Sequence, residues 1–91
     1  MPRSPRLPRK LDLGWGYHVE IKLVTDREMA DECDEEDRSE IPDGLWDVET
    51  RTIFIRRKLP WKRRLIVLLH ERKHAVLDHE HWMADEFELQ P

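Results

Sequence analysis

Apolar and polar positions alternate along the segment from Tyr17 to Val24. The side chains at positions 17, 19, 21 and 23 are apolar, and those at positions 18, 20 and 22 are polar. A period of two is typical of a strand that buries one face and exposes the other. The pattern therefore predicts a half-buried strand over residues 17–24.

Two shorter apolar segments follow a turn at Pro42-Asp43-Gly44. Residues 45–48 and 52–56 are both rich in residues that favour strands, and the polar residues 49–51 join them. This arrangement predicts a hairpin. The second strand, residues 52–56, is also a candidate edge on which an extended peptide could pair.

The segment between the first strand and this turn is strongly acidic. Thr25 is followed three residues later by Glu28, which fits a capping box at the start of a helix. Residues 26–33 are therefore expected to form a short acidic helix or only a loop.

The strongest helical pattern begins at Pro60 and Trp61, because proline is tolerated in the first turn of a helix. With His70 as the reference, one broad apolar stripe falls on the opposite half of the helix and is expected to pack on the sheet. Its members are Trp61, Leu65, Leu68, Leu69, Ala75 and Val76. The face that carries His70 is flanked by Ile66, Val67 and Leu77, which predicts a buried, water-poor setting.

A chain of 91 residues forms one domain at most, with a core so small that a bound metal would help to stabilise it. The net charge of −4 hides a segregation of charge: residues 26–37 are acidic and residues 51–73 are basic. We expect these two blocks to be solvated faces that attract each other. The first 13 residues are expected to be a flexible basic arm, and residues 14–91 the single folded domain.

Cys33 is the only cysteine, so no intrachain disulfide can form. The longest apolar run, Leu65 to Leu69, is too short to span a bilayer. These observations favour a protein of the cytoplasm without a membrane partner.

The motif that carries chemistry is His70-Glu71-Arg72-Lys73-His74, an HExxH sequence. On a helix, His70 and His74 lie one turn apart on one face and can bind the same zinc ion. Glu71 lies about 100° around the helix, where it can reach a water at the metal without ligating it. A catalytic zinc needs a third protein ligand, which must come from elsewhere in the chain. The metzincin pattern is excluded, because no glycine follows Gly44.

With its tail, this motif resembles the ImmA/IrrE family of small zinc peptidases, which are often encoded by phages and mobile elements. The tail shows Ala84, Asp85, Phe87, Leu89 and Pro91 in the family's register, and the resemblance covers about residues 45–91. It implies an α+β, minimal zincin-like fold, in which a small antiparallel sheet packs on the HExxH helix. The family's ligand glutamate falls on His81 of this chain, so the resemblance implies His81 as the third ligand, oriented by Asp85.

Helix geometry limits this assignment. In a continuous helix His81 lies about 16 Å along the axis from His70, out of reach of the same metal. The chain must therefore bend between Leu77 and His81 if His81 is the ligand. The alternative third ligands are Asp78, Glu80, Glu86 and Glu88.

The first functional hypothesis is a zinc endopeptidase that cleaves an intracellular protein or peptide, with Glu71 as the general base. The second is a catalytically inactive zincin-like binding or virion-associated module with structural zinc. A third, nucleic-acid binding through the basic residues 56–64, is disfavoured by the acidic net charge.

Overall fold

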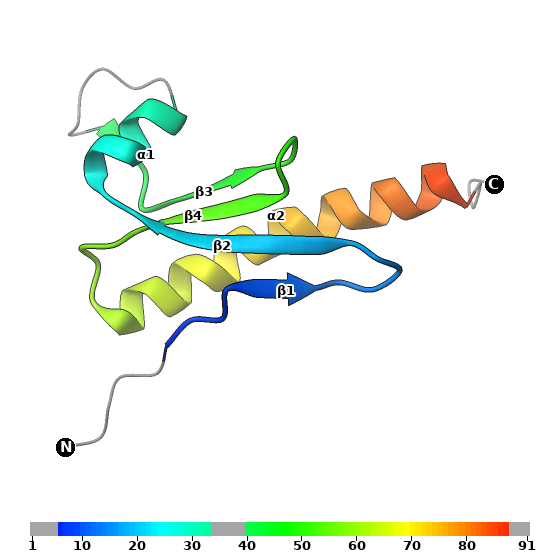
Figure 1. Ribbon diagram of the computed structural model, residues 1–91, viewed down its shortest axis with the longest axis horizontal. Coiled ribbons are helices and arrows are strands. Elements are labelled where there is room, and N and C mark those ends of the chain that lie inside the picture. Colours follow the sequence, from blue (N-terminus) through cyan, green and yellow to red (C-terminus); the bar gives the residue numbers. More distant parts are fainter. Residues whose placement is uncertain (1–5, 34–39, 88–91) are drawn as a thin grey trace.

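The computed structural model describes residues 6–33 and 40–87 and forms an α+β fold (Figure 1). A four-stranded sheet has the order β1-β2-β4-β3. Its strands are β1 (Lys10–Asp12), β2 (His18–Val24), β3 (Gly44–Asp47) and β4 (Thr52–Arg56). Two helices complete the fold, the short α1 (Asp26–Glu32) and the long α2 (Trp61–Glu86).

The alternating segment forms β2, as its pattern predicts. Tyr17 and Val19 are almost completely buried, and His18 and Glu20 between and beside them are exposed. The apolar face of β2 joins Ile53 and Ile55 of β4 in the main core, against Leu68 of α2. The predicted hairpin is also confirmed, because β3 and β4 pair antiparallel.

The expectation of an antiparallel sheet is wrong in one respect: the sheet is mixed. β2 and β4 run parallel, with Ile21 opposite Ile53 and Leu23 opposite Ile55. α1 and the segment that follows it separate the two strands in sequence, and a crossover connection of this kind returns the chain in the same direction.

β4 is a central strand, and this corrects its assignment as an edge for peptide pairing. It pairs with β2 on one side and β3 on the other, and its residues Thr52 to Ile55 are buried. Both faces of β4 are covered: Ile53 and Ile55 face the main core, whereas Phe54 packs with Val24 and Met29 in a second cluster. β3 is the edge strand next to β4 in the described sheet.

Part of the segment that the sequence predicts to be a flexible arm, residues 1–13, is ordered. Residues 10–12 of the expected arm form β1, which pairs antiparallel with β2 and places Leu11 opposite Val19. Leu7, Leu11 and Leu13 pack against the main core, and this apolar contact explains why the segment is ordered. Residues 1–5 of the arm lie outside the described part.

α1 begins with the predicted capping box. The Thr25 hydroxyl accepts a hydrogen bond from the Glu28 amide, and the Glu28 carboxylate accepts one from the Thr25 amide. Met29 is fully buried and packs with Val24 and Phe54, so α1 covers part of the face of the sheet that α2 leaves open.

α2 begins directly after Pro60 and continues without interruption to Glu86. The bend expected between Leu77 and His81 is therefore absent, in keeping with the lack of glycine or proline in that stretch. Figure 1 shows the C-terminal part of α2 extending past the ends of the strands.

The buried face of α2 differs from the expected stripe. Leu68 and Ala75 are buried as predicted, but Trp61, Leu65 and Leu69 are 37%, 40% and 50% exposed. The sheet covers a face roughly a third of a turn from His70, formed by Val67, Leu68, Glu71, Ala75 and His79. Glu71 and His79 of this face are polar, so a pattern of apolar residues alone does not identify it.

Among the described residues, no helix has both the length and the apolar character needed to cross a membrane.

Candidate metal centre

α2 brings His70, Glu71 and His74 together in one group. A ligand atom of each lies within 4.8 Å of the ligand atoms of the other two. The two imidazole rings have centroids 5.1 Å apart and meet edge to face, as expected for residues one helical turn apart. His70 Nε2 is 3.9 Å from Glu71 Oε1.

This donor set fits a zinc ion. Two imidazole nitrogens that bind one zinc at about 2.0 Å each are at most about 4 Å apart. His70 and His74 are exposed, so rotation of their side chains can close the remaining gap without disturbing the core. Imidazole nitrogens and carboxylate oxygens are ordinary zinc ligands.

The setting of the histidines is more open than the sequence predicts. The His70 side chain is 67% exposed, and the flanking Ile66 and Leu77 are 55% and 56% exposed. Only Val67 of the expected flanking residues is buried. The predicted buried, water-poor setting is therefore wrong, because the sheet covers the Glu71 side of the helix and leaves the His70 side open.

Glu71, in contrast, is buried, with only 10% of its side chain exposed. The edge strand β3 passes over it at Gly44, where a Cβ atom would lie 3.1 Å from Glu71 Cγ. The same Cβ would overlap Val67 Cγ1. Glycine at this position lets the β3 backbone approach α2 closely, which fixes the Glu71 side chain between strand and helix.

A groove of about 360 Å³ lies between the start of β3 and α2. It is lined by Pro42, Asp43, Gly44, Arg63, Ile66, Val67, His70 and Glu71. The group of His70, Glu71 and His74 therefore borders a hollow with apolar and charged walls, which is the kind of space a ligand or substrate needs.

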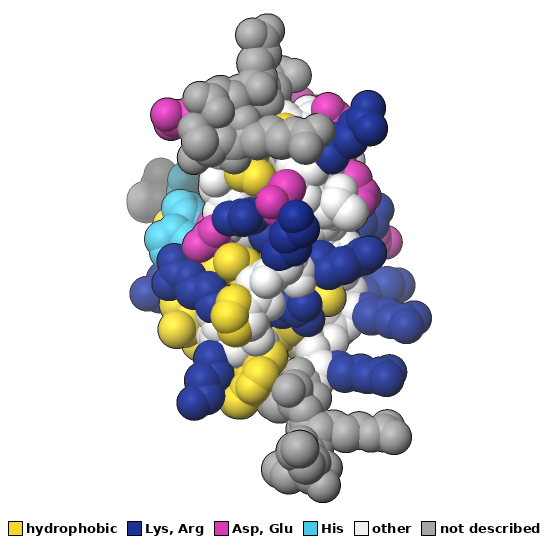
Figure 2. All heavy atoms as spheres, turned by 90° about the vertical axis from the view of Figure 1, so that its left-hand side faces the viewer, with side chains coloured by type: hydrophobic (Ala, Val, Ile, Leu, Met, Phe, Trp, Pro, Cys, Tyr) yellow, Lys and Arg dark blue, Asp and Glu magenta, His cyan; other side chains and the backbone are white. Residues whose placement is uncertain are grey.

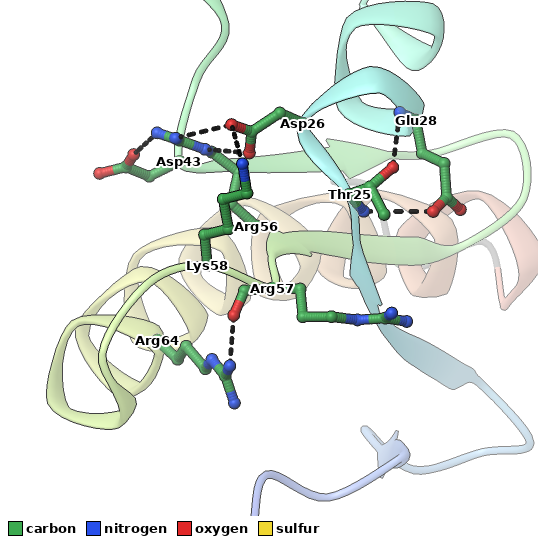
Figure 3. Close-up of polar contacts among 8 residues, drawn as sticks. All are labelled: Thr25, Asp26, Glu28, Asp43, Arg56, Arg57, Lys58 and Arg64. Atoms are coloured by element: carbon green, nitrogen blue, oxygen red, sulfur yellow. Dashed lines mark hydrogen bonds and ion pairs between the residues drawn. The ribbon is translucent and has the colours of Figure 1, made fainter.

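An ion-pair network anchors the turn that forms one wall of this groove (Figure 3). Asp43 accepts hydrogen bonds from Arg56 at 2.9 Å and from Arg63 of α2 at 3.1 Å. Arg56 also donates to Asp26 at 3.0 Å. The hydrogen bonds to Asp26 and Asp43 raise the pKa of Arg56, so the guanidinium stays charged and ties β4, α1 and the turn together.

The same contacts bear out part of the expected attraction between the acidic and basic blocks. Asp26 of the acidic block pairs with Arg56 and lies 3.9 Å from the ammonium group of Lys58. Residues 34–39 of the acidic block lie outside the described part.

None of the proposed third ligands joins the group within the described residues. His81 lies on the same unbroken helix, about 16 Å along the axis from His70, and is exposed. Glu80 and Glu86 lie on that helix too, and Asp78 accepts a hydrogen bond from the Trp46 indole. Glu88 lies outside the described residues. In this fold His81 is therefore too far along α2 from His70 and His74 to share one metal ion with them.

Tyr17, Arg51 and His79 pack together in a cluster that contains no member of the His70, Glu71 and His74 group. Tyr17 is buried. Its ring packs at a tilt against His79, with centroids 4.8 Å apart, and lies 4.0 Å from the Arg51 guanidinium. Burial raises the pKa of the Tyr17 hydroxyl. His79 is only 7% exposed and packs in this aromatic cluster.

A larger hollow, about 730 Å³, lies on the far side of α2 from His70, and half of the residues that line it are basic. Its cationic lining comprises Arg6, Arg9, Lys10, Lys22, Arg57 and Arg64. Figure 2 shows Lys and Arg side chains spread over this end of the molecule, with hydrophobic side chains between them and histidine at one margin. The hollow contains no member of the metal-binding group.

Sequence reasoning found the two histidines and Glu71 but missed Gly44 and the Trp46–Asp78 contact. Pro42-Asp43-Gly44 indicates a turn, and nothing in that pattern reveals which helix the turn will touch. No protein-family model, curated protein or solved structure matches this chain.

Proposed function

We propose that this protein is a zinc-dependent metallopeptidase. One observation carries the proposal: His70, His74 and Glu71 converge within 4.8 Å beside an open groove and under an edge strand. Its resemblance to the ImmA/IrrE family supports the same activity and a zincin-like classification. The substrate is a peptide segment of a protein, which the cytoplasm of a cell or phage host would supply.

Zinc bound there would act as a Lewis acid toward the scissile carbonyl and lower the pKa of a coordinated water to about 7. His70 and His74 hold the ion in place with their exposed imidazoles. Glu71 acts as the general base: its carboxylate takes the proton of the attacking water and passes it to the leaving amine. The Glu71 side chain lies against Gly44 of β3, and its Oε1 is 3.9 Å from His70 Nε2.

The substrate lies extended along β3. This strand ends the sheet, so its outer backbone groups are available to pair with a peptide. The groove beside it offers Ile66 for an apolar side chain and the Asp43–Arg63 pair for a polar one.

A second candidate is a zincin-like scaffold with structural zinc and no turnover. Among the described residues, Glu71 is the only acid grouped with both histidines. This small set of possible metal ligands favours the second candidate. If Glu71 ligates the metal, no general base remains. The two candidates differ in whether Glu71 is needed for metal binding or for proton transfer.

Cleavage of a denatured peptide library, read by mass spectrometry, separates them. We expect the wild type to generate fragments and Glu71→Gln to lose at least ~100-fold in rate, the effect of removing a general base. Glu20→Gln, at an exposed acid of β2, is the matched control and should cleave like the wild type. A wild type that yields no fragments beyond those of Glu71→Gln would contradict the peptidase.

A further inference from the structure

We propose that the third zinc ligand is His81 of a second copy of this chain, in a two-fold symmetric dimer formed by antiparallel α2 helices. Each of its two sites would combine His70 and His74 of one copy with His81 of the partner subunit. This inference rests on the proposed zinc site and names the partner that completes it.

The first argument is the position of His81 on the helix. At 100° per residue, His70, His74 and His81 lie within about 40° of one another around α2. All three side chains are exposed on the unbroken helix. One face of α2 therefore carries His70 and His74, which need a third ligand. The same face carries His81, which is too far along the helix to bind the same metal ion.

The second argument is the apolar surface between and beyond these histidines. Ile66 and Leu77, both within about 40° of His70 around α2, are 55% and 56% exposed. Leu77 lies within about 20° of His70 around the helix and between His74 and His81 along it. Large apolar side chains that recur along a metal-binding helix face favour contact with another helix.

The third argument is complementarity under one symmetry operation. A two-fold axis between Val76 and Leu77 places the midpoint of His70 and His74 opposite His81. The same axis places Lys73 opposite Glu80, so cation meets anion at both ends of the contact, as in antiparallel helix pairs. It also places Leu77 beside its symmetry mate.

The sheet leaves this face free. Its contacts with α2 run through Val67, Glu71 and Ala75, roughly a third of a turn from His70. The C-terminal part of α2 also extends past the strands, where it is open to a neighbour (Figure 1). With His81 of the partner subunit as third ligand, Glu71 keeps its carboxylate for proton transfer.

Complementation by mixing tests the proposal without relying on activity. The His70→Ala, His74→Ala variant keeps His81, whereas the His81→Ala variant keeps His70 and His74. Each alone should bind zinc at least ~10-fold more weakly than the wild type, since even the loss of a ligand's supporting group costs that much. Mixed, they should regain one complete site per dimer, measured as zinc retained against a competing chelator.

Sedimentation provides the second readout. We expect the wild type to be a dimer with zinc and a weaker dimer or monomer in chelator. Leu77→Glu should abolish the zinc-dependent dimer. Lys73→Glu should weaken it, and the swap Lys73→Glu with Glu80→Lys should restore it. His18→Ala, an exposed histidine of β2, is the control and should behave as the wild type.

Two results would overturn the dimer and leave the zinc site intact: a wild type that binds one zinc tightly as a monomer, or a mixture that retains no more zinc than its components. Failure of the wild type to bind zinc at all would overturn the proposed function as well. Full zinc affinity in His81→Ala would contradict the ligand assignment even if the protein dimerises.

Discussion

Gly44 of β3 lies so close to Val67 of α2 that no Cβ atom fits between them. The contact brings the edge strand onto the helix at the position of Glu71, whose Cγ would lie 3.1 Å from such an atom. One small residue thus sets the distance between the strand and the residue we propose as general base.

Replacing Gly44 by alanine tests this contact. The added methyl group overlaps Val67, and we expect Gly44→Ala to lower the free energy of unfolding by about 1–3 kcal/mol, the usual cost of overpacking. Val67→Ala removes the opposing methyl groups, so the double variant should be more stable than the sum of the single effects. Urea denaturation measures all three variants. Additive losses would contradict the close contact.

Trp46 and Asp78 provide a second link between β3 and α2. The Trp46 indole donates a hydrogen bond to the Asp78 carboxylate, and both residues are partly buried. Trp46→Phe keeps an aromatic ring but leaves the carboxylate without this donor, which should cost about 1–3 kcal/mol. Combining it with Asp78→Leu should recover part of the loss. A thermal melt of Trp46→Phe that matches the wild type would argue against the bond.

The capping box of α1 predicts a specific dependence on pH. The backbone hydrogen bond from Thr25 lowers the pKa of Glu28, so the ionised carboxylate is favoured in the folded protein. Its contribution is present above the unfolded pKa of about 4.3 and is lost as the pH falls through the lower folded pKa. Glu28→Gln should therefore be less stable than the wild type at pH 7, and the two melts should converge in acid. A difference that widens in acid would contradict this assignment.

His79 is buried, and its Nε2 has no hydrogen-bond partner among the described residues. Its ring packs against Tyr17 at 4.8 Å and Trp82 at 5.9 Å. His79→Phe should keep these contacts without burying an unpaired polar atom, and stability should be unchanged or higher by about 1 kcal/mol. His79→Ala should lose about 2 kcal/mol or more through the cavity. A large loss in His79→Phe would indicate a polar role for the histidine.

Local patterns predicted most elements correctly. The alternation over residues 17–24, the capping box at Thr25 and the proline before Trp61 each report on their own segment, where short-range forces decide. The direction of β4 relative to β2 depends on the path of the chain between them. No short pattern contains that information, so the mixed sheet and the central place of β4 appeared only in the structure.

One feature of the candidate site also follows from the local sequence, and another depends on the fold. His70, Glu71 and His74 share a helical turn, so their proximity follows from helix geometry alone. The exposure of the two histidines depends on which face of α2 the sheet covers. Polar Glu71 and His79 lie on that face, and a pattern of apolar residues therefore misplaces it by roughly a fifth of a turn.

The zinc content of purified Glu71→Gln, measured by elemental analysis beside the wild type and the His70→Ala, His74→Ala variant, tests the metal centre most directly. We expect about one zinc per chain in the wild type and in Glu71→Gln, because a general base is not a ligand, and little or none in the double histidine variant. Full zinc content in the double histidine variant would contradict the site. Loss of zinc in Glu71→Gln, to the same extent as in the histidine variant, would make Glu71 a ligand and contradict its role as the base.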